Sequence, residues 1–111
     1  MLTRRISLVG PLEGRRTFHT AGYPLAPEEM LPAPDVLLLV DKGSEGCMLF
    51  RYTALGEFGG DTPHETADDA MRQADLEYGE ALLGWIEVPA HVTDAHTFAV
   101  RYAAEQLNER E

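Results

Sequence analysis

The sequence predicts a single α+β domain, in which a mainly antiparallel sheet of about four to five strands carries two helices on one face. Three observations predict it. A wholly apolar run and an alternating run flank a glycine-rich turn, which is typical of a β-hairpin. Two later segments carry apolar residues at helical spacing, and a short apolar run separates them. The order strands, helix, strand, helix favours an α+β sandwich.

The first third of the chain is rich in proline. Five of the seven prolines lie within residues 1–34, so we expect a loop-rich segment there. Within it, short extended pieces are predicted at residues 5–9 and 15–20. Residues 27–31 start with proline followed by two acids, a pattern that suits one helical turn. No linker or repeat follows, and residues 1–111 are expected to form one domain.

The middle of the chain predicts a hairpin. Residues 36–40 are wholly apolar, as expected for a strand that is covered on both faces. Residues 42–46 supply a turn, and residues 47–52 alternate. One face of this second strand carries Met48, Phe50 and Tyr52, and the other carries Cys47, Leu49 and Arg51. A short third strand is predicted at residues 57–59.

Two helices and one more strand complete the prediction. Thr66 and Asp69 have the spacing of a capping box, and Gly79 is expected to end that helix in a left-handed conformation. Its apolar stripe is Ala67, Ala70, Met71, Ala74 and Tyr78. A strand follows at residues 85–88, and the last helix is expected to start at Thr93 or Asp94. Its stripe is Ala95, Phe98, Ala99, Tyr102, Ala103 and Leu107.

Composition limits the class of protein. The chain is 44% hydrophobic and has a formal net charge of -10 at pH 7. The apolar fraction excludes a disordered acidic tail, and no apolar run approaches the roughly 18 residues that span a bilayer. Because the chain is acidic, nucleic acid and a membrane surface are not expected as partners.

The expected compartment is the cytoplasm of a bacterium. Cys47 is the single cysteine and cannot form an internal disulfide. The apolar stretch at residues 6–9 is shorter than the about 7–15 residues of a signal-peptide core. The use of arginine for nearly all basic residues, together with many alanines, is typical of a GC-rich bacterial genome.

Residues 59–69 are the polar segment with the most candidate chemistry. Asp61, His64, Glu65 and Asp68 could hold a divalent metal, or His64 and a carboxylate could act as a general base. The second histidine of a zinc-protease motif is absent. The same residues can instead have structural roles, as a turn, a helix cap and acidic partners of the helix dipole. This structural interpretation is favoured over a metal or catalytic role. We therefore expect no cofactor; Asp61, His64 and Asp68 are the catalytic candidates, and Asp61 and His64 the metal candidates.

The negative charge is concentrated in one region. Residues 57–80 contain eight acids and one arginine, a net charge of -7. A solvated helix face accounts for such a run, and a basic protein partner is the alternative. The binding residues for that partner would be Glu65, Asp68, Asp69, Asp75, Glu77 and Trp85.

Trp85 alternates away from Ile86 and Val88, so it is expected on the less protected face of the sheet. With Leu37, Leu39 and Leu49 this face would form an apolar patch. Either the proline-rich segment or a partner, including a second copy of the chain, would have to cover it.

Residues 45–88 resemble a group of small uncharacterised bacterial proteins. The resemblance rests on the strand at 47–53, the string Gly60-Asp61-Thr62-Pro63-His64-Glu65-Thr66, the helix at 68–79 with its Asp-Asp-Ala, Gln-Ala and Glu-Tyr-Gly elements, and the tryptophan strand that follows. Similar proteins often carry tryptophan at the position of Pro63. The resemblance implies a family without an established reaction, some members of which look like immunity or accessory proteins, and it lends no catalytic residue.

These observations favour a small acidic protein-interaction module over an enzyme. It would be immunity-like or accessory and would bind a basic protein. The alternative is a small metal-dependent or His/Asp hydrolytic enzyme that uses the turn at residues 61–69. A homodimer is a further prediction.

Overall fold

The computed structural model describes residues 3–10 and 33–109, and these confirm the α+β class. The described residues form five strands and two helices: β1 (Thr3–Val9), β2 (Val36–Asp41), β3 (Cys47–Tyr52), β4 (Phe58–His64), α1 (Ala67–Tyr78), β5 (Leu82–Glu87) and α2 (Ala95–Glu109). The elements predicted at 15–20 and 27–31 lie outside the described residues.

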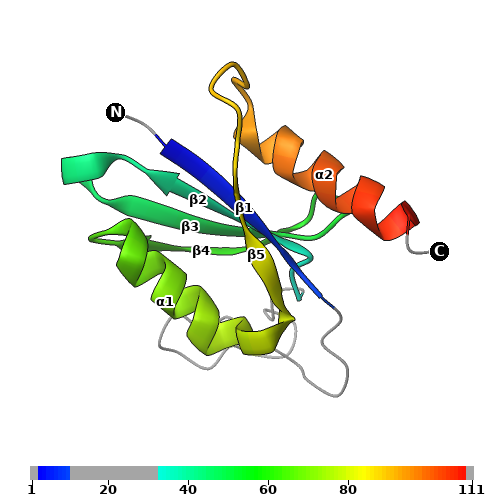
Figure 1. Ribbon diagram of the computed structural model, residues 1–111, viewed down its shortest axis with the longest axis horizontal. Coiled ribbons are helices and arrows are strands. Elements are labelled where there is room, and N and C mark those ends of the chain that lie inside the picture. The colour runs from blue at the N-terminus through cyan, green and yellow to red at the C-terminus, as the bar shows by residue number, and fades with distance from the viewer. Residues whose placement is uncertain (1–2, 11–32, 110–111) are drawn as a thin grey trace.

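The strands form one sheet in the order β4-β3-β2-β1-β5, and every neighbouring pair is antiparallel. β1 to β4 lie side by side in chain order. β5 does not continue that series, because it pairs with β1 at the opposite edge of the sheet. α1 therefore connects the two edge strands, and it crosses the sheet to do so (Figure 1).

The helices cover opposite faces of the sheet, so the prediction that both pack on one face is wrong. Ala70 and Ala74 of α1 pack in one cluster with Leu37 and Leu39. The other cluster joins α2 to the intervening residues of β2, because successive strand residues point to opposite faces. Figure 1 shows α1 below the sheet and α2 above it in that view. Since β2 is apolar on both faces, each face requires its own helix.

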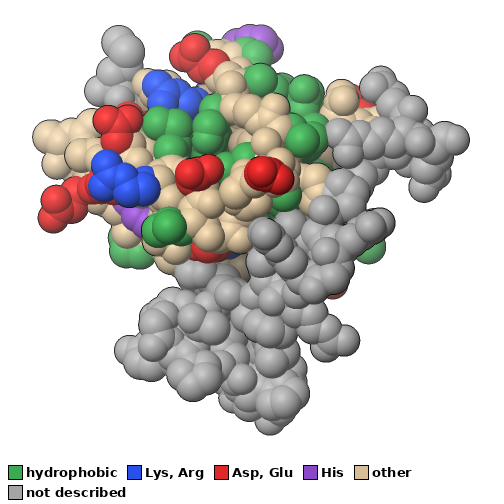
Figure 2. Space-filling view, turned by 60° about the horizontal axis from the view of Figure 1, so that its bottom comes forward, with side chains coloured by type: hydrophobic (Ala, Val, Ile, Leu, Met, Phe, Trp, Pro, Cys, Tyr) green, Lys and Arg blue, Asp and Glu red, His purple; other side chains and the backbone are tan. Residues whose placement is uncertain are grey.

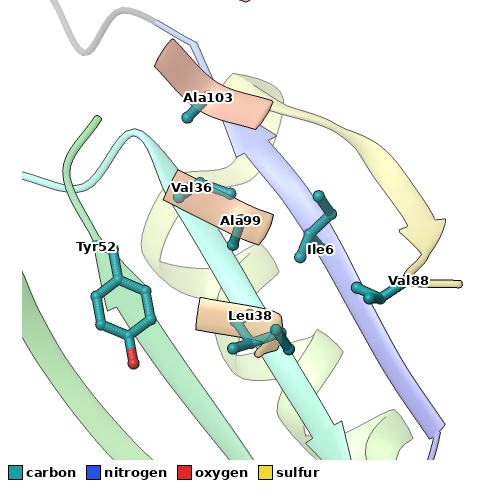
Figure 3. Packing of buried hydrophobic residues seen from close by; sticks show 8 residues of the cluster. Ile6, Val36, Leu38, Tyr52, Val88, Ala99 and Ala103 are labelled. Carbon is teal, nitrogen blue, oxygen red and sulfur yellow. The ribbon is translucent and has the colours of Figure 1, made fainter. Parts of the chain in front are cut away.

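Small side chains bring α2 close to the sheet. Ala95, Ala99 and Ala103 recur at intervals of four, and all three are buried. Figure 3 shows Ala99 and Ala103 facing Val36 and Leu38 from above. The alanine stripe predicted for the last helix is therefore confirmed over these residues.

β4 extends into the segment that was interpreted as a turn. Phe50 pairs with Asp61 and Tyr52 with Phe58, so β4 has one more residue than β3 over this stretch, which is a β-bulge. Gly60 has a φ of 106°, a conformation that L side chains rarely adopt. The glycine is used for the bulge rather than for a turn, and the strand continues to His64.

The predicted Thr66 cap and glycine stop of α1 are confirmed, while the hydrogen bonds of the described residues do not include the reciprocal bond from the Thr66 N–H to the Asp69 carboxylate. The Thr66 hydroxyl accepts a hydrogen bond from the Asp69 backbone N–H at 3.1 Å. At the other end Gly79 has a φ of 48°, and its N–H donates to the carbonyl of Asp75. α2 begins after Asp94, whose carboxylate accepts from the Thr97 N–H at 3.1 Å.

Candidate functional site

A buried polar network lies between α1 and the sheet, with Arg51 at its centre. Arg51 alternates with Cys47 and Leu49 onto the α1 face of β3, as the sequence predicts, and it is 0% exposed. A guanidinium removed from water needs acceptors for its N–H groups and an opposite charge. The position of Arg51 therefore requires a carboxylate from the helix that covers it.

Glu77 of α1 supplies that carboxylate. Arg51 Nε donates to Glu77 Oε1 at 2.9 Å and Nη2 donates to Oε2 at 2.7 Å, which is the bidentate arrangement. Arg51 also donates to the carbonyl of Leu49 and to Thr62 Oγ1, each at 3.3 Å. Gln73, one turn before Glu77, donates to Oε2 at 2.6 Å. The network thus joins β3, β4 and α1 at one point.

The network determines the protonation of its members. Burial raises the pKa of the Glu77 carboxyl, but hydrogen bonds from Arg51 and Gln73 outweigh burial, so the pKa lies below its usual value. Burial raises the pKa of the Tyr78 hydroxyl, and the charge of Glu77 raises it further. Glu77 is therefore ionised and Tyr78 is protonated at neutral pH.

His64 lies at the β4 end of the same network. Its Nε2 is 2.7 Å from Thr62 Oγ1. Burial lowers the pKa of His64 below 6.5 and the charge of Arg51 lowers it further, while the charges of Asp69 and Glu77 oppose the shift. The imidazole is therefore neutral at pH 7 and is hydrogen-bonded to a hydroxyl.

Cys47 and His64 are direct partners in the β3–β4 ladder, although they are far apart in sequence. A thiol beside an imidazole has the components of a nucleophile and its base. Here burial raises the pKa of the Cys47 thiol, the charge of Asp41 raises it further, and only Arg5 opposes this. Cys47 is also 3% exposed, so it has the protonated, enclosed environment of a structural cysteine.

The structure does not gather the candidate catalytic and metal residues. Thr62 and His64 point from β4 toward the α1 face, and Asp61 alternates away from them and is exposed. Asp68 is exposed on the first turn of α1. Within the described part of the chain, no group of three or more His, Cys, Asp or Glu residues could hold a metal ion. The triad of Asp61, His64 and Asp68 is therefore not assembled.

The candidate binding acids divide into two groups. Glu65, Asp68 and Asp75 are exposed, and Asp69 is half-buried with Oδ1 at 3.6 Å from Arg72 Nη1. Glu77 is different, because its side chain is 15% exposed and is bonded to Arg51. Glu77 therefore differs from the other candidate acids, since its carboxylate is bound to Arg51 inside the fold.

Trp85 lies on the face of Leu37, Leu39 and Leu49, and the cover of that face differs from the expectation. It pairs with Ser7 on β1 and packs against the cluster under α1, where Leu37, Leu39 and Leu49 are each 0% exposed. The apolar face is therefore covered by α1, and neither the proline-rich segment nor a partner is required to cover these leucines. Trp85 packs at the margin of this core and is partly exposed.

The outer face of α1 carries one residue that the sequence analysis missed. Leu76 is 77% exposed, between Asp75 and Glu77 in sequence and one turn from Arg72. Figure 2 views the molecule from the α1 side, where acidic side chains are spread over the surface. Leu76 is thus an exposed apolar side chain whose sequence neighbours are acidic.

The buried network had signals in the sequence that were not used. Arg51 follows Cys47 and Leu49 on one strand face, and a charge on an apolar face requires a partner. Gln73 and Glu77 lie three and seven residues after Ala70, on the same side of the helix. Those spacings place Gln73 and Glu77 on the side of α1 that faces the sheet. The pairing of Arg51 with Glu77 also depends on the path of α1 across the sheet, which the sequence does not show.

Comparison with protein-family models, with curated proteins and with solved structures gave no match for the chain. The function must therefore be argued from the site itself. Among the described residues, neither helix has the length and apolar character needed to cross a membrane.

Proposed function

We propose that the protein is a cytoplasmic interaction module that binds a basic protein partner through the outer face of α1. The observation that carries the proposal is the composition of that face. Asp68 and Asp75 are exposed, Glu80 is exposed two residues after the helix ends, and the highly exposed Leu76 lies among them. Carboxylates of this kind accelerate encounter with a basic surface, and an exposed leucine supplies apolar contact area.

The charges in this region are not explained by helix stability alone. Asp68 and Asp69 lie in the first turn of α1, where they favour the helix dipole. Asp75 and Glu80 lie at the opposite end, where the dipole disfavours acidic side chains, and no basic residue occupies the last turn. A cost to helix stability at an exposed position is consistent with a role in binding.

The buried network supports the same proposal over the hydrolytic alternative. His64 is bonded to Thr62, Glu77 is bonded to Arg51, and the pKa of the Cys47 thiol is raised by burial. The imidazole and the carboxylate are thus engaged in structural hydrogen bonds, and the thiol is enclosed and protonated. An immunity-like or accessory role, in which the partner is a basic bacterial protein, fits a small binding domain of this kind.

The test is capture of partners from a lysate of the native cell with the tagged full-length chain. The variant Asp68→Lys, Asp75→Lys, Glu80→Lys reverses the α1 face. The control Glu45→Lys, Glu57→Lys, Glu105→Lys reverses three exposed acids elsewhere and gives the same net charge. We expect a partner that is retained at low salt by the wild type and the control and is lost by the α1 variant, because only that variant removes the complementary charge.

The role of Leu76 is tested separately. Leu76→Ala should weaken the same interaction without changing its salt dependence, since it removes apolar contact and no charge. If the α1 variant captures the same proteins as the control at every salt concentration, the proposal is wrong.

A further inference from the structure

β5 is an apolar strand that the fold leaves largely exposed. Leu83 is 50% exposed and Ile86 is 40% exposed, and among the described strands β5 pairs with β1 alone. On the α2 side, a hollow of about 230 Å³ is lined by Leu8, Leu83, Gly84, Ile86, Tyr102 and Gln106. α2 packs over β2 and β1, so this side of β5 remains open.

The two edges of the sheet differ in how they are protected. β4 contains Pro63, which has no N–H to donate. Asp61 and Pro63 are both exposed and lie on the same face of the strand. Proline and charge on an edge strand oppose pairing with another chain. β5 has no proline within its bounds, and its one charged residue is Glu87. Of the two edges that the described strands form, the β5 edge is therefore the one that lacks features opposing a further strand.

The alternation of hydrogen bonds along β5 shows which of its backbone N–H and C=O groups point away from β1. The Val88 N–H donates to the carbonyl of Arg4 at 2.8 Å. Because bonded residues alternate in an antiparallel ladder, Ile86 also bonds toward β1, while the N–H and C=O groups of Trp85 and Glu87 point outward. No hydrogen bond joins these outward groups to the described residues.

We propose that β5 is a dimerisation edge, on which two copies of this chain pair antiparallel around a two-fold axis at Ile86. In this register Trp85 exchanges its two outward hydrogen bonds with Glu87 of the second copy, and Glu87 does the same with Trp85. The two Ile86 side chains meet on the α2 face, next to the two hollows. The sheets of the two copies become continuous across the axis.

A second copy of the chain is the occupant that this edge fits, because its outward residues are complementary to themselves and its local charge is mixed. Two chains that each carry a net charge of -10 repel one another over most of their surfaces. Next to β5 the balance differs, because β1 contributes Arg4 and Arg5, and Arg5 is the ladder partner of Glu87. The edge is also self-complementary, since one two-fold register satisfies both outward residues at once. This inference is independent of the proposed partner of α1.

The first test compares proline substitutions at the two edges. Glu87→Pro removes an outward N–H from β5 and leaves the bonds to β1 in place. Asp61→Pro is the matched control on β4. In sedimentation experiments on the full chain, we expect wild type and Asp61→Pro to form a species of twice the 12.3 kDa chain mass as concentration rises, and Glu87→Pro to remain monomeric. A wild-type chain that stays monomeric at its solubility limit overturns the proposal, and so does a folded Glu87→Pro that dimerises as well as the control.

The second test does not depend on the proline variants folding. Opposed residues in a non-hydrogen-bonded pair have Cα atoms about 4.5 Å apart, which allows a disulfide. Ile86→Cys should form a covalent dimer under mild oxidation. Leu55→Cys, at a position that is 88% exposed, is the control and should not, while the native Cys47 is buried in both. Equal cross-linking of the two variants, or none in Ile86→Cys, contradicts the proposed register.

Discussion

Arg51 is the charged side chain that the described part of the fold buries completely. Its two bonds to Glu77 give it a counter-charge, and its bonds to Leu49 and Thr62 occupy further N–H groups. Buried ion pairs of this kind add little net stability compared with apolar residues, because desolvation offsets attraction. Removing one member of such a pair is costly, since the other charge then stays buried without its counter-charge.

Arg51→Met should therefore destabilise the protein strongly. It leaves the Glu77 carboxylate under α1 without the guanidinium, and the expected loss is about 3–5 kcal/mol of unfolding free energy. Urea unfolding followed by circular dichroism measures it. The double variant Arg51→Met, Glu77→Leu removes both charges and should recover much of the loss. If the double variant is as unstable as the sum of the two single variants, the two residues are not coupled.

His64 predicts a pH dependence of stability. Burial first, and then Arg51, lower its pKa in the folded state below 6.5, so the unfolded chain binds the proton more readily. The contribution of His64 is complete above pH 6.5 and is lost as the pH falls through the lowered pKa. Unfolding free energy should therefore decrease on acidification from pH 7.

The matched comparison uses two histidine variants. His64→Gln keeps a hydrogen-bonding group and should flatten the change in unfolding free energy between about pH 7 and 5. His91→Gln alters an exposed histidine and should retain the wild-type slope. Equal slopes for the two variants would show that His64 does not titrate as the structure implies.

At the scale of residues, sequence reasoning identified which strand face Cys47, Leu49 and Arg51 share, and this is confirmed. It did not identify the Arg51–Glu77 pair, because the partner of a buried charge depends on which helix covers that face. Glu77 lies within an acidic run and looked like its exposed neighbours. Only its helical phase with Ala70 and Ala74 distinguishes it.

At the scale of elements, the capping signals were the most reliable. Thr66→Ala removes the hydroxyl that accepts from the Asp69 N–H, and we expect a loss of about 0.5–2 kcal/mol in unfolding free energy. Thr66→Asp retains an acceptor and should lose less. Thermal or urea unfolding measures both, and no loss in Thr66→Ala would show that the cap contributes nothing.

The two element-level errors have physical reasons. Residues 59–64 contain glycine, aspartate and proline, which usually form turns, yet the Gly60 bulge and the edge position of Pro63 keep them in β4. The placement of both helices on one face ignored a signal already noted, namely that residues 36–40 are apolar on both sides. A strand of that kind requires a layer on each face.

At the scale of the whole molecule, the described residues form a sheet between two helices, and exposed acidic residues lie on α1 as well as on other parts of the surface. The number and antiparallel arrangement of the strands could be predicted from the order of the elements. The position of β5 at the far edge could not, because its short apolar run is compatible with either edge. The position of β5 follows from the path of α1, which crosses the sheet from the β4 edge and brings the chain next to β1.

That passage of α1 also has a consequence for folding. The ladder between Arg5 and Glu87 joins residues from opposite ends of the chain, so it closes late and at high entropic cost, while β2 and β3 are joined by a short turn. β5 should therefore open in partial unfolding events that leave β2 and β3 intact. Native-state hydrogen exchange is expected to show the Ile86 amide exchanging well before the amides of Leu38 and Leu49, whereas exchange of all three at one common rate would indicate a single cooperative unit.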